Sequence, residues 1–400
     1  MKAGSPLAAD YFCPGVRMGF QTPIALESAG LLRSAHVDVC FTPGDAARAL
    51  SMIAGARVAN RVVHGVPRER IRLHPQLTAA ARFRRRLLLS GQDTTPADRL
   101  LISMFSSIAR QCHSDAVVGT QSSCLELFEG RAHRVMEQVS PPLRYERAVA
   151  AAELDRFPGW APPGVTRPSD WDHRMEAEWQ SADVIWVPSR HLINISERFG
   201  ADPAKFRVIP YPIASPSLPA TGRNFERGRE LRIIFAGTLM LEKGVQYIYE
   251  ALRSSPGLPV RIEFFGPVNL SPLGLRCLAG IGTIHGPVPR ARLFEEFRQA
   301  DMLLFPSLSE GNALVTLEAS ALGLPVVATE ESGALPSAMI IPARSSDAIT
   351  EAIEALAEDR TLLGSLSDAG LAQAAERNLT AYKDAIADSW SELTGGSSDS

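Results

Sequence analysis

The second half of the chain is constrained above all by a regular alternation of apolar runs and helical patterns. Apolar runs of strand length recur from Leu231 onward, and segments with the period of an amphipathic helix lie between them. Strands that are buried on both faces are continuously apolar, so this alternation predicts a parallel sheet covered by helices on both sides. We expect strands at 231–236, 260–265, 302–306, 325–329 and 338–342, and helices at 243–253, 290–299, 313–322 and 347–358.

The first half shows the same alternation less regularly, with apolar runs at 37–42, 115–119 and 183–188 that read as short strands. Between the halves lies a stretch rich in proline, serine and charge, which is typical of a linker. We therefore predict an N-terminal domain at 1–212, a linker at 213–230, a second domain at 231–375, a helix at 376–394 that could pack back on the first domain, and a disordered tail at 395–400.

Composition excludes several classes of protein. The chain has 400 residues with a net charge of -3, whereas a dedicated nucleic-acid binder usually has a strong basic excess, so we expect no nucleic-acid partner. The five cysteines form no CxxC pair, which favours reduced thiols over disulfides or a zinc site. No N-terminal signal and no run approaching the roughly 18 apolar residues of a membrane span is visible, so we expect a cytoplasmic protein.

An acid stands inside an apolar helical pattern near the end of the chain. Leu314, Leu317, Ala321 and Leu322 recur at helical spacing, and Glu318 lies among them. A buried glutamate needs a polar partner, which could be an arginine of the fold or a ligand. Glu310 lies in the loop before this helix, at the carboxyl end of strand 302–306, where open α/β sheets bind their ligands. The alternative is that Glu310 has no ligand and only stabilises the N-terminus of this helix through the helix dipole.

The run from Pro306 to Ala328 resembles the two-glutamate signature of family 4 retaining glycosyltransferases, with seven residues between Glu310 and Glu318. The resemblance implies the GT-B fold, α/β with two facing Rossmann-like doubly wound domains, and transfer of a sugar from a UDP- or GDP-linked donor. It implies that Glu310 lies near the transferred sugar and that Glu318 binds the ribose. The loop residues implied to bind the donor beside Glu318 are Gly311, Asn312, Ala313 and Leu314.

A second segment at the end of strand 231–236 also resembles the family. Gly237 permits a tight turn, and Lys243 stands where the following helix would begin, so that a bound diphosphate would offset an unfavourable interaction with the helix dipole. The family's equivalent lysine binds the donor diphosphate, which makes Lys243 a catalytic candidate; an exposed lysine is the alternative. Thr238 stands where relatives often carry an arginine. The resemblance implies no metal and no cofactor, because the nucleotide sugar is a co-substrate.

The acceptor side should lie in the first domain. The segment with Gly19 and Phe20 precedes a helical pattern with Thr22 as expected N-cap, and resembles a loop that faces the acceptor. Glu137 lies in a segment that resembles the family's interdomain strand, and Pro142 stands where some relatives carry a histidine. We expect a glycan, lipid-linked or small-molecule acceptor.

Four arginines, Arg82, Arg84, Arg85 and Arg86, lie close together around Phe83. A basic and partly apolar helix could contact an anionic membrane, which would suit a lipid-linked acceptor; a solvated or acid-paired face is the alternative. The sequence thus predicts a hexosyltransferase with a role such as polysaccharide biosynthesis. The alternative, favoured by Thr238 and Pro142, is a catalytically silent GT-B protein that binds a nucleotide or glycan or acts as a scaffold.

Overall fold

The structure is a computed structural model that describes residues 7–15, 20–41, 61, 63–89, 94–162, 173–213, 225 and 229–395. The chain divides into two compact units. Unit 1 comprises Met1–Pro142, Arg167–Pro212 and Leu379–Ser400, and unit 2 comprises Leu143–Thr166 and Ile213–Asn378.

Unit 1 contains, among its described residues, a seven-stranded parallel sheet in the order β3-β2-β1-β4-β5-β6-β7. The strands are β1 (Ala9–Cys13), β2 (Leu32–Val37), β3 (Ile71–Leu73), β4 (Ala116–Thr120), β5 (His133–Glu137), β6 (Val184–Val187) and β7 (Phe206–Val208). The helices are α1 (Gln21–Ser28), η2 (Arg68–Arg70), α4 (Gln76–Leu89), α5 (Thr95–Ala109), α6 (Leu125–Phe128), α8 (Arg174–Ser181), α9 (Arg190–Arg198), η4 (Pro203–Lys205) and α16 (Leu379–Thr394).

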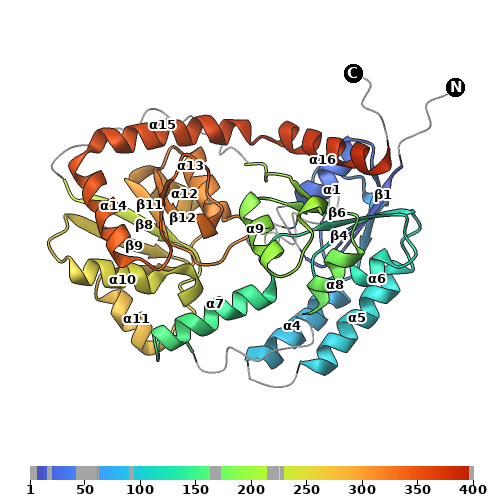
Figure 1. The fold of residues 1–400 in the computed structure, drawn as a ribbon, viewed down its shortest axis with the longest axis horizontal. Coiled ribbons are helices and arrows are strands. Elements are labelled where there is room, and N and C mark those ends of the chain that lie inside the picture. The colour runs from blue at the N-terminus through green and yellow to red at the C-terminus, as the bar shows by residue number, and fades with distance from the viewer. Residues whose placement is uncertain are drawn as a thin grey trace. The chain divides into compact units, whose positions relative to one another are not determined.

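Helices cover both faces of this sheet. Figure 1 shows α1 and α16 on one side of the strands and α4, α5, α6 and α8 on the other. The central strands β4 and β6 are buried along their whole length, which explains why their sequences are continuously apolar. The last helix is joined to the sheet by hydrogen bonds, since the indole N–H of Trp186 on β6 donates to the Ser389 hydroxyl at 2.8 Å.

The described part of unit 2 contains a six-stranded parallel sheet in the order β10-β9-β8-β11-β12-β13. The strands are β8 (Leu231–Ala236), β9 (Val260–Phe265), β10 (Gly282–Gly286), β11 (Met302–Phe305), β12 (Val326–Thr329) and β13 (Met339–Ile341). The helices are α7 (Leu143–Arg156), η5 (Leu241–Lys243), α10 (Val245–Ser254), α11 (Pro272–Ala279), α12 (Arg290–Gln299), α13 (Leu314–Ala321), η6 (Glu330–Ser332), α14 (Ser346–Glu358) and α15 (Arg360–Glu376).

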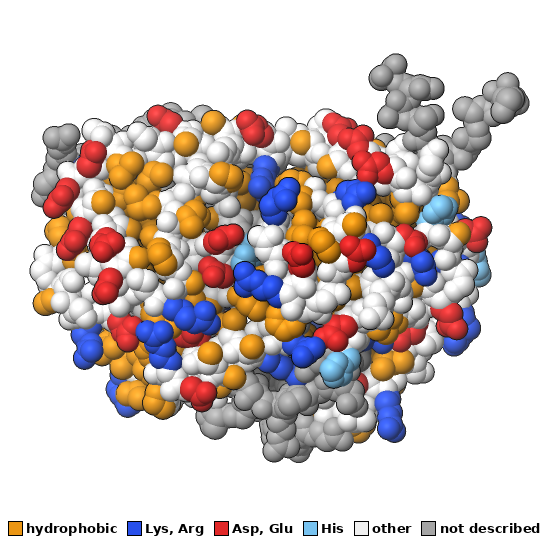
Figure 2. Space-filling view, viewed as in Figure 1, with side chains coloured by type: hydrophobic (Ala, Val, Ile, Leu, Met, Phe, Trp, Pro, Cys, Tyr) orange, Lys and Arg blue, Asp and Glu red, His pale blue; other side chains and the backbone are white. Residues whose placement is uncertain are grey.

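The helices of unit 2 also lie on both faces of their sheet, with α10 and α11 on one side and α12 and α13 on the other (Figure 1). Helix α14 illustrates how these helices pack on the sheet. It is amphipathic, with Ile349, Ile353 and Leu356 buried and its acidic side chains exposed to solvent. Figure 2 shows acidic side chains over α14 at the left of the view, and elsewhere on this face acidic and basic side chains are interspersed. Both units are therefore doubly wound, as the alternation in the sequence predicts.

The structure differs from the predicted elements where a strand is not continuously apolar. The strand expected at 37–42 is β2 at Leu32–Val37, whose residues Arg33 and Ser34 interrupt the apolar pattern. Sequence analysis missed α11 and β10 altogether. Strand β10 is an edge strand that is nowhere fully buried, so that its sequence carries no apolar run.

The structure also divides the chain differently from the predicted domain of 1–212. Leu143–Thr166 belongs to unit 2, because Val149, Phe157 and Trp160 lie in the hydrophobic core of that unit. The residues expected to form a linker are grouped with unit 2 as well, and most of them lie outside the described residues. Helix α16 belongs to unit 1, where it packs against α1. The tail at 396–400 lies outside the described residues.

Candidate functional site

The strand order of unit 2 creates a crevice at the carboxyl edge of its sheet. The chain proceeds from β8 outward through β9 to β10, then crosses to β11 on the opposite side and continues to β13. The connections after β8 and β11 therefore lead to opposite sides of the sheet, and such a reversal of strand order is where open α/β sheets bind ligands. These two loops carry the candidate residues Gly237 to Gly244 and Glu310 to Ala313.

The loop after β8 is held close to the sheet by its glycines. The N–H of Gly237 donates to the carbonyl of Phe265 at 2.9 Å, so it is not available to a ligand as expected from the sequence. A Cβ on Gly266 would lie 2.0 Å from the Gly237 carbonyl oxygen, which leaves no room for a side chain there. The half-buried Thr238 follows directly in this loop.

Lys243 ends the short helix η5 and does not begin α10 as predicted. Gly244 separates the two with a φ of 72°, a left-handed conformation that favours glycine. A Cβ at this position would lie 2.0 Å from the carbonyl oxygen of Pro306, in the loop after β11. The two loops therefore meet at Gly244, and Lys243 is directed toward the second loop.

Lys243 and Glu310, the two catalytic candidates, form an ion pair. The Lys243 ammonium donates to Glu310 Oε1 at 2.5 Å and to the carbonyl of Ser309 at 3.1 Å. Both side chains remain about a fifth exposed, at 20% and 21%. A positive and a negative group thus stand side by side at the opening of the crevice, where a phosphate could meet the ammonium and a sugar the carboxylate.

The N-terminus of α13 provides backbone donors, although not all the ones that the sequence indicated. The N–H of Ala313 donates to the carbonyl of Ser332 at 2.8 Å and is therefore occupied. No described side chain caps the helix. The N–H groups of its first turn, from Leu314 and Val315, consequently remain for an anion.

Asn312 is fixed just before this helix, while Gly311 is buried beside it. The Asn312 side-chain amide donates to the carbonyl of Gly333, and its Oδ1 has no hydrogen-bond partner among the described residues. Gly333 itself has a φ of 64° and would bring a Cβ to 3.0 Å from the Asn312 amide nitrogen. Asn312 thus presents an unused acceptor oxygen in a tightly packed loop.

Glu318 lies at the edge of the buried face of α13 that the spacing of the leucines predicts, because Leu317 and Leu322 are buried but Leu314 is not. The buried residues are Thr316, Leu317, Ala319 and Ser320, whereas Leu314 is 40% exposed and Glu318 is 16% exposed. Burial raises the pKa of the Glu318 carboxyl above its ordinary value, and the guanidinium of Arg290 opposes that rise.

Arg290 is the arginine that one interpretation of the sequence required. It stands at the start of α12 and approaches Glu318 Oε1 to 2.5 Å, yet its own side chain is 57% exposed. A partner that is so exposed can move away, so the ion pair does not prevent Glu318 from binding a ligand. Arg290 was not identified from the sequence, because nothing in its own segment indicates that the start of α12 lies beside Glu318 of α13.

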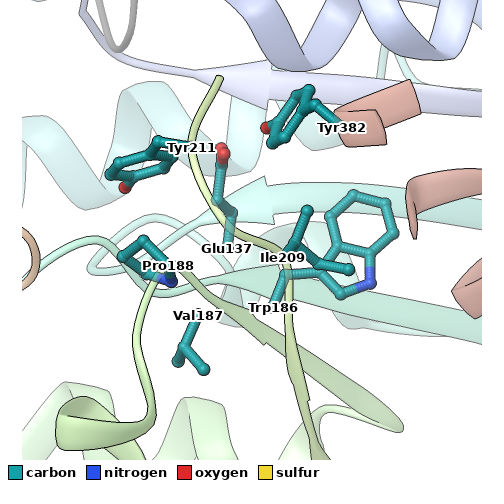
Figure 3. A pocket seen from close by; sticks show the side chains of 7 residues that line it. All are labelled: Glu137, Trp186, Val187, Pro188, Ile209, Tyr211 and Tyr382. Carbon is teal, nitrogen blue, oxygen red and sulfur yellow. The ribbon is translucent and has the colours of Figure 1, made fainter. Parts of the chain in front are cut away.

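On the acceptor side, the carboxylate of Glu137 is buried at the end of β5. It accepts hydrogen bonds from the hydroxyls of Thr22 at 2.6 Å and Tyr11 at 3.2 Å. Figure 3 shows this carboxylate between Tyr211 and Tyr382. The cavity that these residues line measures ≈ 10 Å³, about the space of one water molecule. Glu137 therefore joins β5 to β1 and α1, and the Thr22 hydroxyl joins this group to Tyr382 of α16 at 2.9 Å. Tyr382 was not foreseen from the sequence.

The start of α1 differs from the predicted cap. Phe20 precedes the helix with a φ of 64°, an uncommon left-handed conformation for a bulky residue. Thr22 is the second helical residue, and its hydroxyl donates to Glu137 instead of capping the helix. Gly19 lies outside the described residues.

A larger cavity of ≈ 370 Å³ lies in unit 1, where α5, α6 and α8 begin. Its lining includes the exposed Arg99 and the buried Arg174, which is paired with Glu126 at the side of the cavity. The helices that precede or follow parallel strands on this side begin at the carboxyl edge of the sheet. The cavity therefore lies toward the same edge of unit 1 as Glu137.

Neither a metal site nor a membrane-spanning helix is found in the part of the chain that the structure describes. No group of three or more His, Cys, Asp or Glu side chains there is arranged to hold a metal ion. Among these same residues no helix has both the length and the apolar character needed to cross a bilayer.

The part of the chain that carries the candidate donor loops is similar in sequence to a known family. The family "Glycosyl transferases group 1" matches residues 230–359. A D-inositol 3-phosphate glycosyltransferase of Xylanimonas cellulosilytica is 33% identical over 195 residues, which cover 43% of this chain and 46% of that protein. The chain spans less than half the length of the curated relatives that it matches.

Solved structures resemble almost the whole chain at low sequence identity. Anabaena Alr3699/HepE in complex with UDP-glucose has a TM-score of 0.60 at 13% identity, covering 96% of this chain and 100% of that one. The galactosyltransferase WaaB has a TM-score of 0.55 at 15% identity, with coverages of 96% and 100%. These similarities confirm the expected GT-B fold class. In sequence, residues 230–359 are similar to the group 1 glycosyl transferases.

Proposed function

We propose that this protein is a retaining glycosyltransferase that moves a hexose from a UDP-sugar to an acceptor. The observation that carries the proposal is the grouping of Lys243, Glu310 and Glu318 around the carboxyl ends of β8 and β11. UDP is favoured over GDP because solved neighbours such as Alr3699/HepE are complexes with UDP or UDP-glucose.

The leaving diphosphate would be held by Lys243 and by the first-turn N–H groups of α13. Negative charge grows on this diphosphate as the bond to the sugar breaks, so donors fixed in advance lower the barrier. Lys243 would exchange its ion pair with Glu310 for the phosphate. Glu310, released from the ammonium, would orient the sugar and stabilise positive charge at its anomeric carbon. Glu318 would accept hydrogen bonds from the ribose hydroxyls.

Of the donor-side candidates, Gly237, Thr238, Gly311, Asn312 and Ala313 would shape the loops around the diphosphate. The N–H groups of Gly237 and Ala313 already have partners, so we assign these two residues to loop geometry and not to direct donation. The unused Oδ1 of Asn312 is a candidate acceptor for a sugar hydroxyl.

The acceptor would bind at the carboxyl edge of unit 1, beside Phe20 and Glu137. The cavity of ≈ 370 Å³ is of a size that suits a small polar molecule. Curated relatives named D-inositol 3-phosphate glycosyltransferase make a phosphorylated polyol a candidate acceptor, and the exposed Arg99 would suit its charge. Arg99→Ala should then raise the KM for such an acceptor with little effect on the donor.

The first experiment is thermal unfolding of the purified protein with UDP, GDP and their sugars, without added metal. A ligand at a hundredfold excess over its dissociation constant stabilises the folded state by about 2.7 kcal/mol, a clear shift of the midpoint. Release of UDP from UDP-sugars, with or without acceptor, then tests turnover. Stabilisation by UDP together with sugar transfer supports the proposal, and the absence of both refutes it.

The second candidate function is a catalytically silent nucleotide- or glycan-binding or scaffold protein. Thr238 and Pro142, where relatives often carry an arginine and a histidine, favour it. It predicts stabilisation by a nucleotide or glycan without any turnover of donors. Slow hydrolysis of a UDP-sugar by water alone would be enough to reject it.

We also propose a peripheral contact of α4 with an anionic membrane on the cytoplasmic side. Arg82, Arg85 and Arg86 are exposed together with Phe83, and no acid occurs in the helix. Arg84 pairs with Asp98. Cosedimentation with vesicles of phosphatidylglycerol and phosphatidylcholine tests the contact, which Phe83→Ser should weaken.

A further inference from the structure

Helix α7 belongs to unit 2 although the chain enters it from unit 1. It lies in the sequence between β5 and α8, two elements of unit 1, and begins six residues after Glu137. Its inner side contributes Val149 to the core of unit 2, and the turn that follows contributes Phe157 and Trp160. Figure 1 shows α7 in green. This excursion gives the helix access to the donor-side loops.

A fully buried carboxylate joins α7 to the loop that carries Lys243. Glu153 is 0% exposed and accepts hydrogen bonds from the Gln246 amide at 2.8 Å and the Tyr247 hydroxyl at 2.7 Å. It also accepts one from Arg344 Nε at 2.7 Å. The Gln246 amide donates in turn to the carbonyl of Leu241 at 2.9 Å, in the short helix that ends at Lys243.

A second contact joins α7 to the loop that carries Glu310. The Tyr145 hydroxyl donates to the carbonyl of Leu308 at 3.1 Å. The N–H of Leu308 donates to the carbonyl of Glu242 at 2.8 Å, so this residue links the two loops to each other as well. Helix α7 thus makes a direct hydrogen bond to the loop of Glu310 and reaches the loop of Lys243 through Gln246 of α10. The two carbonyls that are bonded, those of Leu308 and Leu241, each lie two residues from a member of the ion pair.

A role in packing alone does not explain Glu153. A buried carboxylate loses its hydration, and an apolar residue of similar volume stabilises a fold equally well or better. What a carboxylate with three fixed donors provides is a single geometry, because any displacement leaves a buried polar group without its partner. Such a contact is suited to holding a loop in position.

We propose that α7 is a strap that positions the two donor-side loops, with Glu153 and Tyr145 as its positioning residues. Glu153 sets the position of Lys243 through Gln246 and Leu241, and Tyr145 sets that of Glu310 through Leu308. The inference rests on the proposed function for its catalytic consequence. The positioning itself is a property of the free protein and can be measured without a ligand.

Glu153→Gln keeps the shape of the side chain but replaces one acceptor oxygen by an NH2 group, so the side chain can no longer accept from all three donors at once. UDP should bind about tenfold more weakly than to the wild type, because one charge-assisted contact, that of Lys243 with the phosphate, is lost. Uridine has no phosphate for Lys243 to contact, so its affinity should stay within about twofold of the wild-type value. Tyr145→Phe should lower kcat for UDP-sugar turnover about tenfold and leave KM within about twofold, because Glu310 contacts the transferred sugar.

Two variants serve as controls. Asp155→Asn makes the same chemical change at an exposed position of α7 and should alter neither ligand affinity nor kcat. Ile353→Ala removes buried apolar atoms from α14 and destabilises unit 2 without touching either loop. It shows what general destabilisation does to the ratio of UDP to uridine affinity. An equal change of that ratio in Ile353→Ala and Glu153→Gln would overturn the proposal.

Hydrogen–deuterium exchange of the unliganded protein separates failure of the strap from failure of the proposed function. In Glu153→Gln, amides at 239–246 should exchange about tenfold faster than in the wild type, with α14 unchanged. Unaltered exchange in that segment would reject the strap even if UDP binds. Faster exchange in a protein that binds no UDP would support the strap and reject the proposed function.

Discussion

Replacing Glu318 by leucine should separate ligand binding from stability. In the free protein this glutamate has one strong partner, Arg290 at 2.5 Å, and its side chain is 16% exposed. Its neighbour Leu314 is 40% exposed on the same face of α13. A leucine at 318 would therefore extend an apolar surface that already exists, with no buried group left unpaired, since Arg290 is itself 57% exposed.

The two effects differ in size. An ion pair with so exposed a partner contributes about 1 kcal/mol or less to stability, and part of that is offset because burial raises the pKa of Glu318 and disfavours its charged form. The free energy of unfolding should thus change by no more than about 1 kcal/mol. Hydrogen bonds from two ribose hydroxyls to a carboxylate contribute about 1.5 kcal/mol each or more, so UDP should bind at least about a hundredfold more weakly.

Isothermal titration with UDP and urea unfolding of the same preparations measure both quantities. Arg290→Ala is the matched control, because it breaks the same ion pair and leaves the carboxylate in place. It should bind UDP within about threefold of the wild type if Glu318 contacts the ribose. UDP affinity that is unchanged in Glu318→Leu, or reduced equally in both variants, would refute the role assigned to Glu318.

Three further changes have definite expected outcomes. Lys243→Ala should lower kcat/KM for a UDP-sugar about a hundredfold or more while the thermal midpoint stays within a few degrees, because the side chain is 20% exposed; enzyme kinetics beside calorimetry checks this. Gly244→Ala places a Cβ 2.0 Å from the Pro306 carbonyl oxygen at a φ of 72°, so we expect unit 2 to lose about 3 kcal/mol or more in urea unfolding; a variant as stable as the wild type would contradict the crowding. Burial lowers the pKa of His36 from 6.5 in the unfolded chain to about 4 in the folded protein. As the pH falls from 6.5 to 4, the unfolded chain therefore binds a proton at His36 that the folded protein does not, and this favours unfolding. Stability of unit 1 should therefore fall by about 3 kcal/mol more in the wild type than in His36→Gln between pH 7 and pH 4, as urea titrations at each pH would show.

Much of unit 2 could be predicted from the sequence because its central strands are buried on both faces. The bounds expected for β8, β9 and α12 agree with the structure residue by residue. Failures occurred where burial is partial, as in edge strand β10 and in α13, where Leu317 and Leu322 are buried as predicted but Leu314 is exposed. Periodicity shows that a helix has an apolar side, but it does not show that a ligand site leaves part of that side uncovered.

The sequence by itself determined the two α/β halves, the loops at the carboxyl ends of β8 and β11, and Lys243, Glu310 and Glu318 as residues of interest. The halves and loops follow from local pattern and spacing, which neighbouring residues encode, and the three residues follow from the resemblance of their segments to the motifs of a known family. Only the tertiary structure decided that Lys243 pairs with Glu310, that Gly237 and Ala313 use their N–H groups within the fold, and that α7 crosses to unit 2. Each of these depends on contacts between segments far apart in the chain. Burial and hydrogen bonding select such contacts only when the whole unit has folded, so no local pattern carries them.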